Sequence, residues 1–184
     1  MYIFNLSLSN GIVPDKLKLA KVIPVFKKSD PKYMTSFRPI SLLSIFNKLL
    51  EKIMYVRLYS HLHHRHVLNP YQFGFRRNYS TTLALIDVVD GIYQHLDNNE
   101  LVIGIYLNLQ KAFDTVNHDI LLSKLNIYGV RGVVHKWFKS YLSGRHQFTW
   151  YPDSYSRAIV RRTIVRGQLF DGQLFARSCV RAGI

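Results

Sequence analysis

The sequence predicts an α+β fold, and three observations lead to that class. Apolar residues make up 48% of the 184 residues, a proportion that is ordinary for globular proteins. A chain of this length holds one domain with a sizeable core. Strand-like and helix-like patterns follow one another in the order hairpin, helix, helix, strand, helix, helix. That order is an α+β pattern.

The first predicted element is a β-hairpin. Residues 20–26 (AKVIPVF) form a short apolar run of strand length, and Pro24, which has no N–H to donate, favours an edge position. Ser-Asp-Pro at 29–31 is a turn signal. Residues 37–40 then return as the second strand. Basic side chains therefore lie at the tip of the predicted hairpin.

Two amphipathic helices follow the hairpin. Residues 41–61 have apolar side chains at helical spacing, and Leu-Asn-Pro at 68–70 breaks the chain. Residues 71–77 (YQFGFRR) are irregular and aromatic. Ser80 is the expected N-cap of the second helix, which ends near Leu96. The apolar positions of the two helices are Leu42, Ile45, Phe46, Leu49, Ile53, Met54 and Leu58, and Leu83, Ile86, Val89, Ile92 and Tyr93.

One strand and two further helices complete the predicted unit, which spans residues 1–150. Residues 101–107 are an apolar run rich in β-branched side chains, with Asn108 at its carboxyl end. A helix starts near Asp119 and ends near Gly129, whose position suits a left-handed C′ residue. The last helix covers residues 133–142, and Ser-Gly at 143–144 ends it.

The net charge of +14 and the pI near 10 indicate a polyanionic partner, above all nucleic acid. Residues 1–80 contain 13 Lys and Arg against 3 acidic residues, a net of +10. Residues 81–150 contain six of each sign, and residues 151–184 have a net of +4. The basic surface thus belongs mainly to the N-terminal half. The alternative is a basic surface that serves only solubility.

Residues 151–184 differ in character from the rest of the chain. They repeat units of five residues, such as RRTIV at 161–165 and DGQLF at 171–175, a period that matches neither helix nor strand. A single tandem DNA repeat encodes both units when it is read in two neighbouring frames. We therefore expect a translated repeat with a frame slip that is not part of the fold; the alternative is an ordinary basic tail.

Cysteine usage and hydropathy bear on the location of the protein. The single cysteine, Cys179, excludes an intrachain disulfide and fits a reducing, intracellular compartment, nuclear or cytoplasmic. We expect no membrane partner, because apolar runs are too short to span a bilayer and the N-terminus lacks a basic leader.

Five segments in register resemble the reverse transcriptases of non-LTR (LINE-type, jockey-like) retrotransposons. Residues 101–118 (LVIGIYLNLQKAFDTVNH) are similar to the family's first metal-binding motif, which typically reads F-x-D-L-x-K-A-F-D-T-V-x-H. The other four segments are the basic hairpin, Arg-Pro-Ile at 38–40, QFGFR at 72–76 and WFKSYL at 137–142. The resemblance implies the fingers and the front of the palm of a right-hand polymerase, with an incomplete palm sheet.

The family's activity is RNA-directed DNA polymerisation, with Mg²⁺, deoxynucleotides, an RNA template and a DNA primer. Mg²⁺ prefers carboxylate oxygen, and two ions activate the primer hydroxyl and neutralise the triphosphate. Where the family has a metal-binding aspartate, this sequence has the neutral Asn108, and no Asp-Asp pair occurs in the 184 residues. We therefore expect no intact metal site and no productive Mg²⁺ binding. Asp114 is nearby, but we interpret it as a hydrogen-bond acceptor before a helix.

The resemblance also assigns binding roles. Lys27, Lys28 and Arg38 match the fingers residues that hold the incoming nucleotide, for which a lysine and a forked arginine suit phosphate oxygens. Phe113 matches the aromatic gate beneath the sugar; its alternative role is a core aromatic. Near the template path the matching residues are Gln72, Phe73, Arg76 and Arg77, which combine ring stacking with phosphate contact.

Four histidines, at positions 61, 63, 64 and 66, raise the question of a zinc site. With one distant cysteine and no nearby carboxylate, we interpret them instead as a frayed, solvent-facing helix end. The leading hypothesis is an inactive reverse transcriptase fragment. The alternatives are a non-catalytic nucleic-acid-binding remnant and a translated pseudogene without function.

Overall fold

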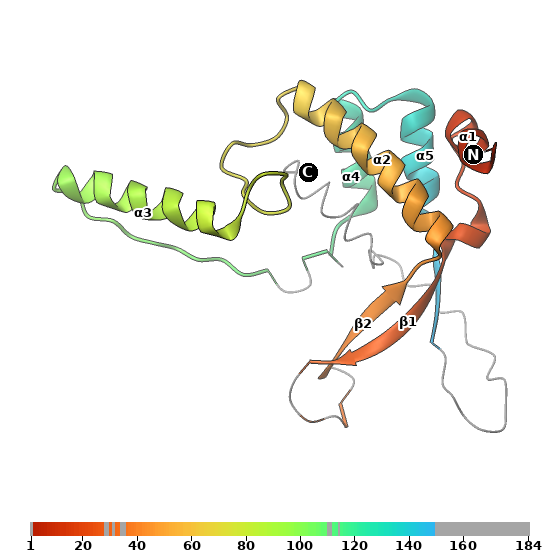
Figure 1. Cartoon of the computed structure of the whole chain (residues 1–184), viewed down its shortest axis with the longest axis horizontal. Coiled ribbons are helices and arrows are strands. Elements are labelled where there is room, and N and C mark those ends of the chain that lie inside the picture. The colour runs from red at the N-terminus through yellow and green to blue at the C-terminus, as the bar shows by residue number, and fades with distance from the viewer. Residues whose placement is uncertain are drawn as a thin grey trace.

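A computed structural model of the protein describes residues 2–27, 30, 32–33, 36–109, 112–113 and 115–149. Within these residues the fold is mixed α+β, as predicted (Figure 1). The elements are α1 (Tyr2–Asn10), η1 (Asp15–Lys18), β1 (Leu19–Phe26), β2 (Phe37–Leu42), α2 (Ile45–His64), α3 (Thr81–Asp97), α4 (His118–Ile127), α5 (Gly132–Leu142) and β3 (His146–Thr149). The repeat tail at 151–184 lies outside the described residues.

The predicted hairpin forms, and a third strand extends it. β1 and β2 pair antiparallel from Lys21↔Leu42 to Phe26↔Phe37, and β3 pairs with β1 in parallel, giving the order β2-β1-β3. The prediction of an edge strand for Pro24 is therefore wrong, because β1 is the central strand. Proline is tolerated there because the described pairing with β3 ends at Val22 and the β2 residue opposite Pro24 is another proline.

Helix α2 starts four residues later than predicted. Residues 41 and 42 still belong to β2, and the Ser44 hydroxyl accepts a hydrogen bond from the Asn47 N–H at 3.2 Å, which caps the helix. The predicted apolar face is only partly right, because Ile45, Phe46 and Leu49 are exposed. The buried stripe consists of Asn47, Leu50, Glu51, Met54, Leu58 and Leu62.

The core lies where α1, α2, α4 and α5 meet (Figure 1). Helix α5 contributes its three largest side chains, since Trp137, Phe138 and Tyr141 are all 2% exposed or less. The Trp137 and Tyr141 rings are parallel, with centroids 5.2 Å apart, and the indole N–H donates to the Ser7 hydroxyl at 3.1 Å. The apolar side chains of the WFKSYL motif therefore lie in the interior of the fold.

Helix α4 begins and ends close to the residues that the sequence predicts. Asn117 caps α4 through its side-chain oxygen, which accepts from the N–H groups of Asp119 and Ile120. Gly129 has φ of +88°, so it occupies the left-handed C′ position predicted for it. Helix α1 and strand β3 were not predicted.

The predicted strand at 101–107 does not form. Residues 101–109 have no regular secondary structure, and Leu101, Ile103 and Leu107 are 97%, 86% and 87% exposed. Strands are stabilised by a partner ladder, and no strand among the described residues pairs with this one. The β-forming residues of this segment therefore lack the partner strand that they need to form a strand.

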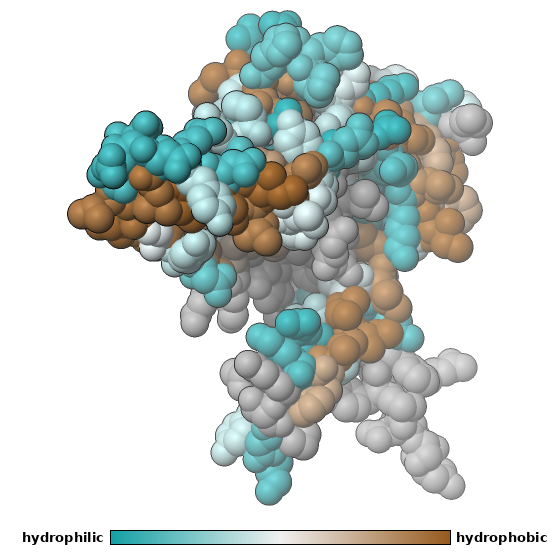
Figure 2. Space-filling view, turned by 60° about the vertical axis from the view of Figure 1, so that its left-hand side comes forward, coloured by the Kyte–Doolittle hydropathy of each residue, from teal (hydrophilic) through white to brown (hydrophobic). Residues whose placement is uncertain are grey.

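Helix α3 forms as predicted, with the Ser80 hydroxyl accepting from the Leu83 N–H at 3.1 Å. It stretches away from the rest of the molecule and none of its residues is buried (Figure 1). Together with residues 101–109 it makes an arm whose apolar side chains are exposed. Figure 2 turns this arm toward the viewer, and brown apolar surface lies along it.

Candidate nucleic-acid interface

The hairpin places two of the predicted nucleotide-binding residues together. Arg38 lies on β2 opposite Val25, and the Lys27 N–H donates to the Ser36 carbonyl at 2.8 Å, which extends the ladder by one residue. Side chains two residues apart on a strand share a face. Lys27 and Arg38 are therefore exposed neighbours on one face of the hairpin tip. Lys28 lies outside the described residues.

The loop at 71–79 is held by its own arginine and aromatic rings. The Arg76 guanidinium lies 4.3 Å from the centroid of the Tyr79 ring and donates to the Asn69 carbonyl at 2.9 Å. The Phe73 and Tyr79 rings pack edge to face at 5.6 Å. Gln72 donates to the Gly74 carbonyl at 3.4 Å, whereas Arg77 is exposed.

Phe113 links the loop to the segment that contains Asn108. Its ring packs edge to face against Phe75, with centroids 6.0 Å apart. The Phe75 backbone has φ of +60°, a conformation that only a surrounding structure imposes on a bulky residue. The structure thus brings Phe113 and the QFGFR motif together. The hairpin extends from the other end of α2, so the two groups of basic residues lie apart (Figure 1).

The donor set around Asn108 does not fit a pair of Mg²⁺ ions. Asn108 is exposed and offers a neutral amide oxygen. In the described part of the chain no three His, Cys, Asp or Glu side chains lie close enough together to hold a metal ion. Two ions need several carboxylates that bridge them. Asp114 lies outside the described residues.

A groove that was not predicted separates α2 from the loop. We call it the α2 groove; it has a volume of about 990 Å³ and is lined by Lys52, Tyr55, Val56, Tyr59, Ser60, His63, His64, Arg76, Arg77, Asn78 and Tyr79. The signal for it in the sequence is the four-residue spacing of Tyr55, Tyr59 and His63 on one helix. His63, His64 and His66 are exposed, as the interpretation of a solvent-facing helix end predicts, and His63 and His64 also line this groove.

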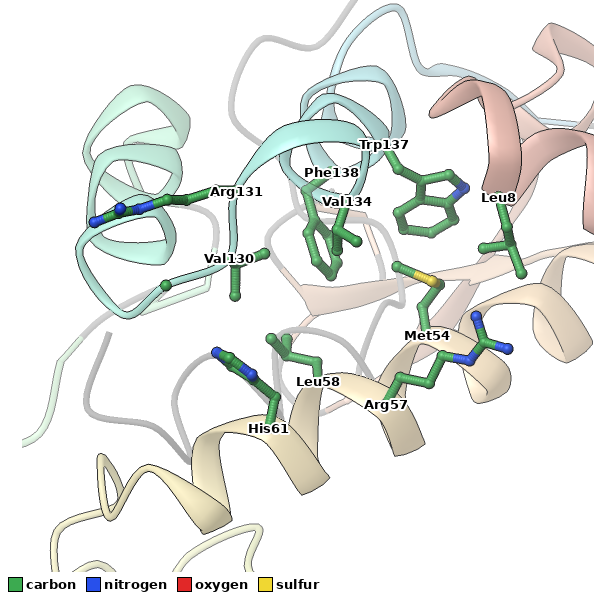
Figure 3. A pocket seen from close by; sticks show the side chains of 11 residues that line it. Leu8, Met54, Arg57, Leu58, His61, Val130, Arg131, Val134, Trp137 and Phe138 are labelled. Carbon is green, nitrogen blue, oxygen red and sulfur yellow. The ribbon is translucent and has the colours of Figure 1, made fainter.

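His61 has a different environment, at the apolar cavity of about 230 Å³ shown in Figure 3. This cavity lies between α1, α2 and α5, with Trp137, Met54 and Leu8 around it. The His61 Nε2 atom lies 3.0 Å from the Tyr128 carbonyl oxygen, which ties α2 to the turn after α4. His61 is half-buried, so the prediction of a solvent-facing side chain is wrong for it.

A buried polar cluster joins the start of α2 to the end of α5. The Asn47 amide donates to Glu51 Oε1 at 2.9 Å, and the Tyr141 hydroxyl donates to the same oxygen. Burial raises the pKa of Tyr141 well above 10.0, with Arg145 opposing and Glu51 reinforcing this shift. Burial lowers the pKa of His118 below 6.5, opposed by Asp119 and reinforced by Arg145. The hydrogen bonds of Asn47, Glu51 and Tyr141 thus tie the first turns of α2 to the end of α5.

Comparison with known proteins identifies the family. The profile of the reverse transcriptase (RNA-dependent DNA polymerase) family matches residues 26–166. That span includes the hairpin tip, the loop at 71–79 and the segment with Asn108, and it continues past residue 150. The chain belongs to the reverse transcriptase family, and its relatives are polymerases of non-LTR retrotransposons.

Three relatives from Drosophila melanogaster illustrate the similarity. The probable RNA-directed DNA polymerase from transposon BS is 32% identical over 182 residues, 95% of this chain and 19% of that protein. The RNA-directed DNA polymerase from mobile element jockey is 35% identical over 123 residues, 66% of this chain and 13% of that protein. The probable polymerase from transposon X-element is 31% identical over 144 residues, 78% and 16% respectively. The chain thus spans less than a fifth of each relative.

The hydropathy of the helices bears on membrane insertion. Among the helices that the structure describes, none combines the length and the apolar character needed to cross a bilayer.

Proposed function

We propose that this chain is the fingers and the front of the palm of a retrotransposon reverse transcriptase, and that it binds nucleic acid without polymerising it. The observation that carries the proposal is the family match over residues 26–166, and it is supported by Asn108 at the position where the resemblance implies a metal-binding aspartate. The net charge of +10 over residues 1–80 supports a retained polyanion-binding surface.

We assign the contacts with phosphate groups to two separate regions of the chain. Lys27 and Arg38 at the hairpin tip suit the triphosphate of a deoxynucleotide, whereas Arg76 and Arg77 in the loop suit the backbone of an RNA template. Gln72 and Phe73 shape the loop, and Phe113 packs beside it through Phe75.

The proposed lack of polymerase activity rests on the missing negative charge at position 108. A neutral amide at Asn108 leaves the charge of a Mg²⁺–triphosphate complex uncompensated at the step where electrostatic stabilisation matters most. Purified chain should therefore extend no primer on an RNA template with Mg²⁺ or Mn²⁺. Template-dependent extension that co-purifies with the chain through successive columns contradicts this half of the proposal.

Binding is tested by the salt dependence of RNA affinity. Neutralising Arg76 and Arg77 to Gln should lower the slope of log affinity against log salt by about 0.7 for each phosphate that the variant no longer neutralises. Neutralising Lys27 and Arg38 to Gln should weaken deoxynucleotide binding instead. A matched control is Lys124→Gln on α4, remote in sequence from both regions, which should change neither. An unchanged slope in the loop variant assigns the RNA surface elsewhere.

One observation favours the alternative that the chain is a pseudogene product without function. The exposed apolar arm, α3 with residues 101–109, is typical of a chain that associates non-specifically. If the chain is a translated pseudogene product, it should aggregate and should show no saturable RNA binding.

A further inference from the structure

The α2 groove combines stacked rings and cations, and the predicted site residues that line it, Arg76 and Arg77, account for only one of its two walls. Tyr55, Tyr59 and His63 follow one another along α2 at four-residue spacing, with ring centroids 5.9 and 6.1 Å apart. The Tyr59 and His63 rings are inclined by only 28°. Lys52 Nζ lies 5.4 Å from the centroid of the Tyr55 ring and extends the row by one turn. The wall formed by α2 is thus a ladder of rings with a cation at one end.

The opposite wall of the groove is also cationic and aromatic. It is formed by residues 76–79, where the Arg76 guanidinium covers the Tyr79 ring and Arg77 is exposed. The charged side chains in the described lining, Lys52, Arg76 and Arg77, are all cations. A volume of about 990 Å³ between the walls leaves room for a polymer rather than a single small ion.

We propose that the α2 groove holds a single strand of nucleic acid, with bases stacked on the ring ladder and phosphates against Lys52 and Arg77. This inference rests on the proposed nucleic-acid-binding function and extends it to residues of α2. The cations alone suit any polyanion, whereas ring faces suit a ligand that has flat, unpaired bases. A duplex hides its base faces within its own stack, so a single strand fits better.

The test compares an RNA with its abasic counterpart of equal length on the full chain, by fluorescence anisotropy. Tyr59→Leu keeps an apolar side chain of helical preference but removes the ring, and Tyr59→Phe keeps the ring. The first variant cannot stack on a base, so its RNA binding should weaken by between about fivefold and a hundredfold. Tyr59→Phe should bind like the parent chain. Affinity for the abasic strand should be the same in all three proteins.

The cations provide a second, independent variant in case the ring substitution alters folding. Lys52→Gln, which leaves both loop arginines in place, should lower the salt slope of RNA binding by about 0.7, the contribution of one phosphate contact. The matched control is Arg57→Gln, because Arg57 lies on the same helix but lines the apolar cavity of Figure 3. This control should leave the slope unchanged.

The possible outcomes separate this inference from the proposed function. If RNA binds but Tyr59→Leu matches the parent chain and the Lys52→Gln slope equals that of Arg57→Gln, α2 does not contact the RNA and the inference is wrong, whereas the loop and hairpin assignments of the proposed function stand. If poly-glutamate competes as well as RNA of equal charge, the groove takes acidic polypeptide and the inference is wrong. If the parent chain binds no RNA, both the inference and the proposed function fail.

Discussion

Glu51 and Tyr141 show how individual residues fix the relation between helices. Glu51 is 3% exposed, and a carboxylate at such a position is stable only when it is hydrogen-bonded. Asn47 and Tyr141 supply those bonds from α2 and α5, respectively. The cluster thus joins the helix that follows the hairpin to the helix that supplies the largest side chains of the core.

Tyr141→Phe tests this cluster. Removing a hydroxyl that donates to a buried carboxylate should lower the free energy of unfolding by about 1.5–3 kcal/mol, as measured by urea denaturation at neutral pH. The same substitution at Tyr93, which is 62% exposed on α3, is the matched control and should change it by less than about 0.5 kcal/mol. Equal effects at the two positions contradict the assigned role.

The raised pKa of Tyr141 also predicts the pH dependence of stability. An unfolded tyrosine ionises near pH 10, whereas folded Tyr141 keeps its proton to higher pH. Above pH 10 the folded state therefore binds more protons than the unfolded state, and stability falls as pH rises. Urea denaturation between pH 9 and 11 should show a steeper fall for the parent chain than for Tyr141→Phe. Parallel curves contradict the shift.

At the scale of elements, local signals predicted most of the fold. The Ser80 cap, the Gly129 terminus and the turn between β1 and β2 depend on neighbouring residues, so the sequence alone locates them. The prediction of a strand at 101–107 was wrong because a strand forms only when a second strand, distant in the sequence, pairs with it. The buried face of α2 was partly wrong because Asn47 and Glu51 lie in the core with hydrogen bonds that periodicity does not reveal.

The same reasoning applies to the candidate site. The sequence placed Lys27 with Arg38, because hairpin partners are local, and it located the loop from its motif. It missed Lys52, Tyr55 and Tyr59, because their role arises only when residues 76–79 return alongside α2. No pattern within α2 indicates which segment lies opposite it.

Helix α3 offers a prediction about dynamics. Helices in proteins are stabilised mainly by packing of their apolar face, and α3 has no buried residue to provide such packing. Its amide hydrogens should therefore exchange much faster than those of α2 and α5, as measured by mass spectrometry. Ser80→Ala, which removes the cap, should speed exchange in α3 without affecting α5. Protection in α3 equal to that in α5 contradicts the description of α3 as an unsupported arm.

At the scale of the whole molecule, the exposed arm predicts self-association. Ile103 and Ile105 are 86% and 79% exposed in a segment without secondary structure. Replacing both with Thr should reduce concentration-dependent light scattering, because it removes apolar surface, and should leave the urea midpoint unchanged. Lys139→Thr on α5 is the control for surface substitution. If the Ile variant scatters as much as the parent chain, association arises from another surface.

The whole chain combines a basic N-terminal half, a helical core and Asn108 at the position where the resemblance implies a metal-binding aspartate. Under the proposed function, binding and catalysis are separate: the hairpin, the loop and the α2 groove suit nucleic acid and nucleotides, whereas the neutral Asn108 does not supply the negative charge that a metal ion needs. This separation is the central claim, and it predicts that a single substitution matters in a full-length polymerase but has no effect in the chain alone.

The most direct measurement is a two-by-two primer-extension comparison. The chain, with Asn108 or with Asn108→Asp, is assayed alone and after it replaces the matching segment of the polymerase from mobile element jockey, which serves unaltered as the positive control. We predict no extension by either form of the chain alone, little by the chimera with Asn108, and much more once Asn108→Asp restores the carboxylate. Equal extension by the two chimeras contradicts the claim that Asn108 prevents polymerisation.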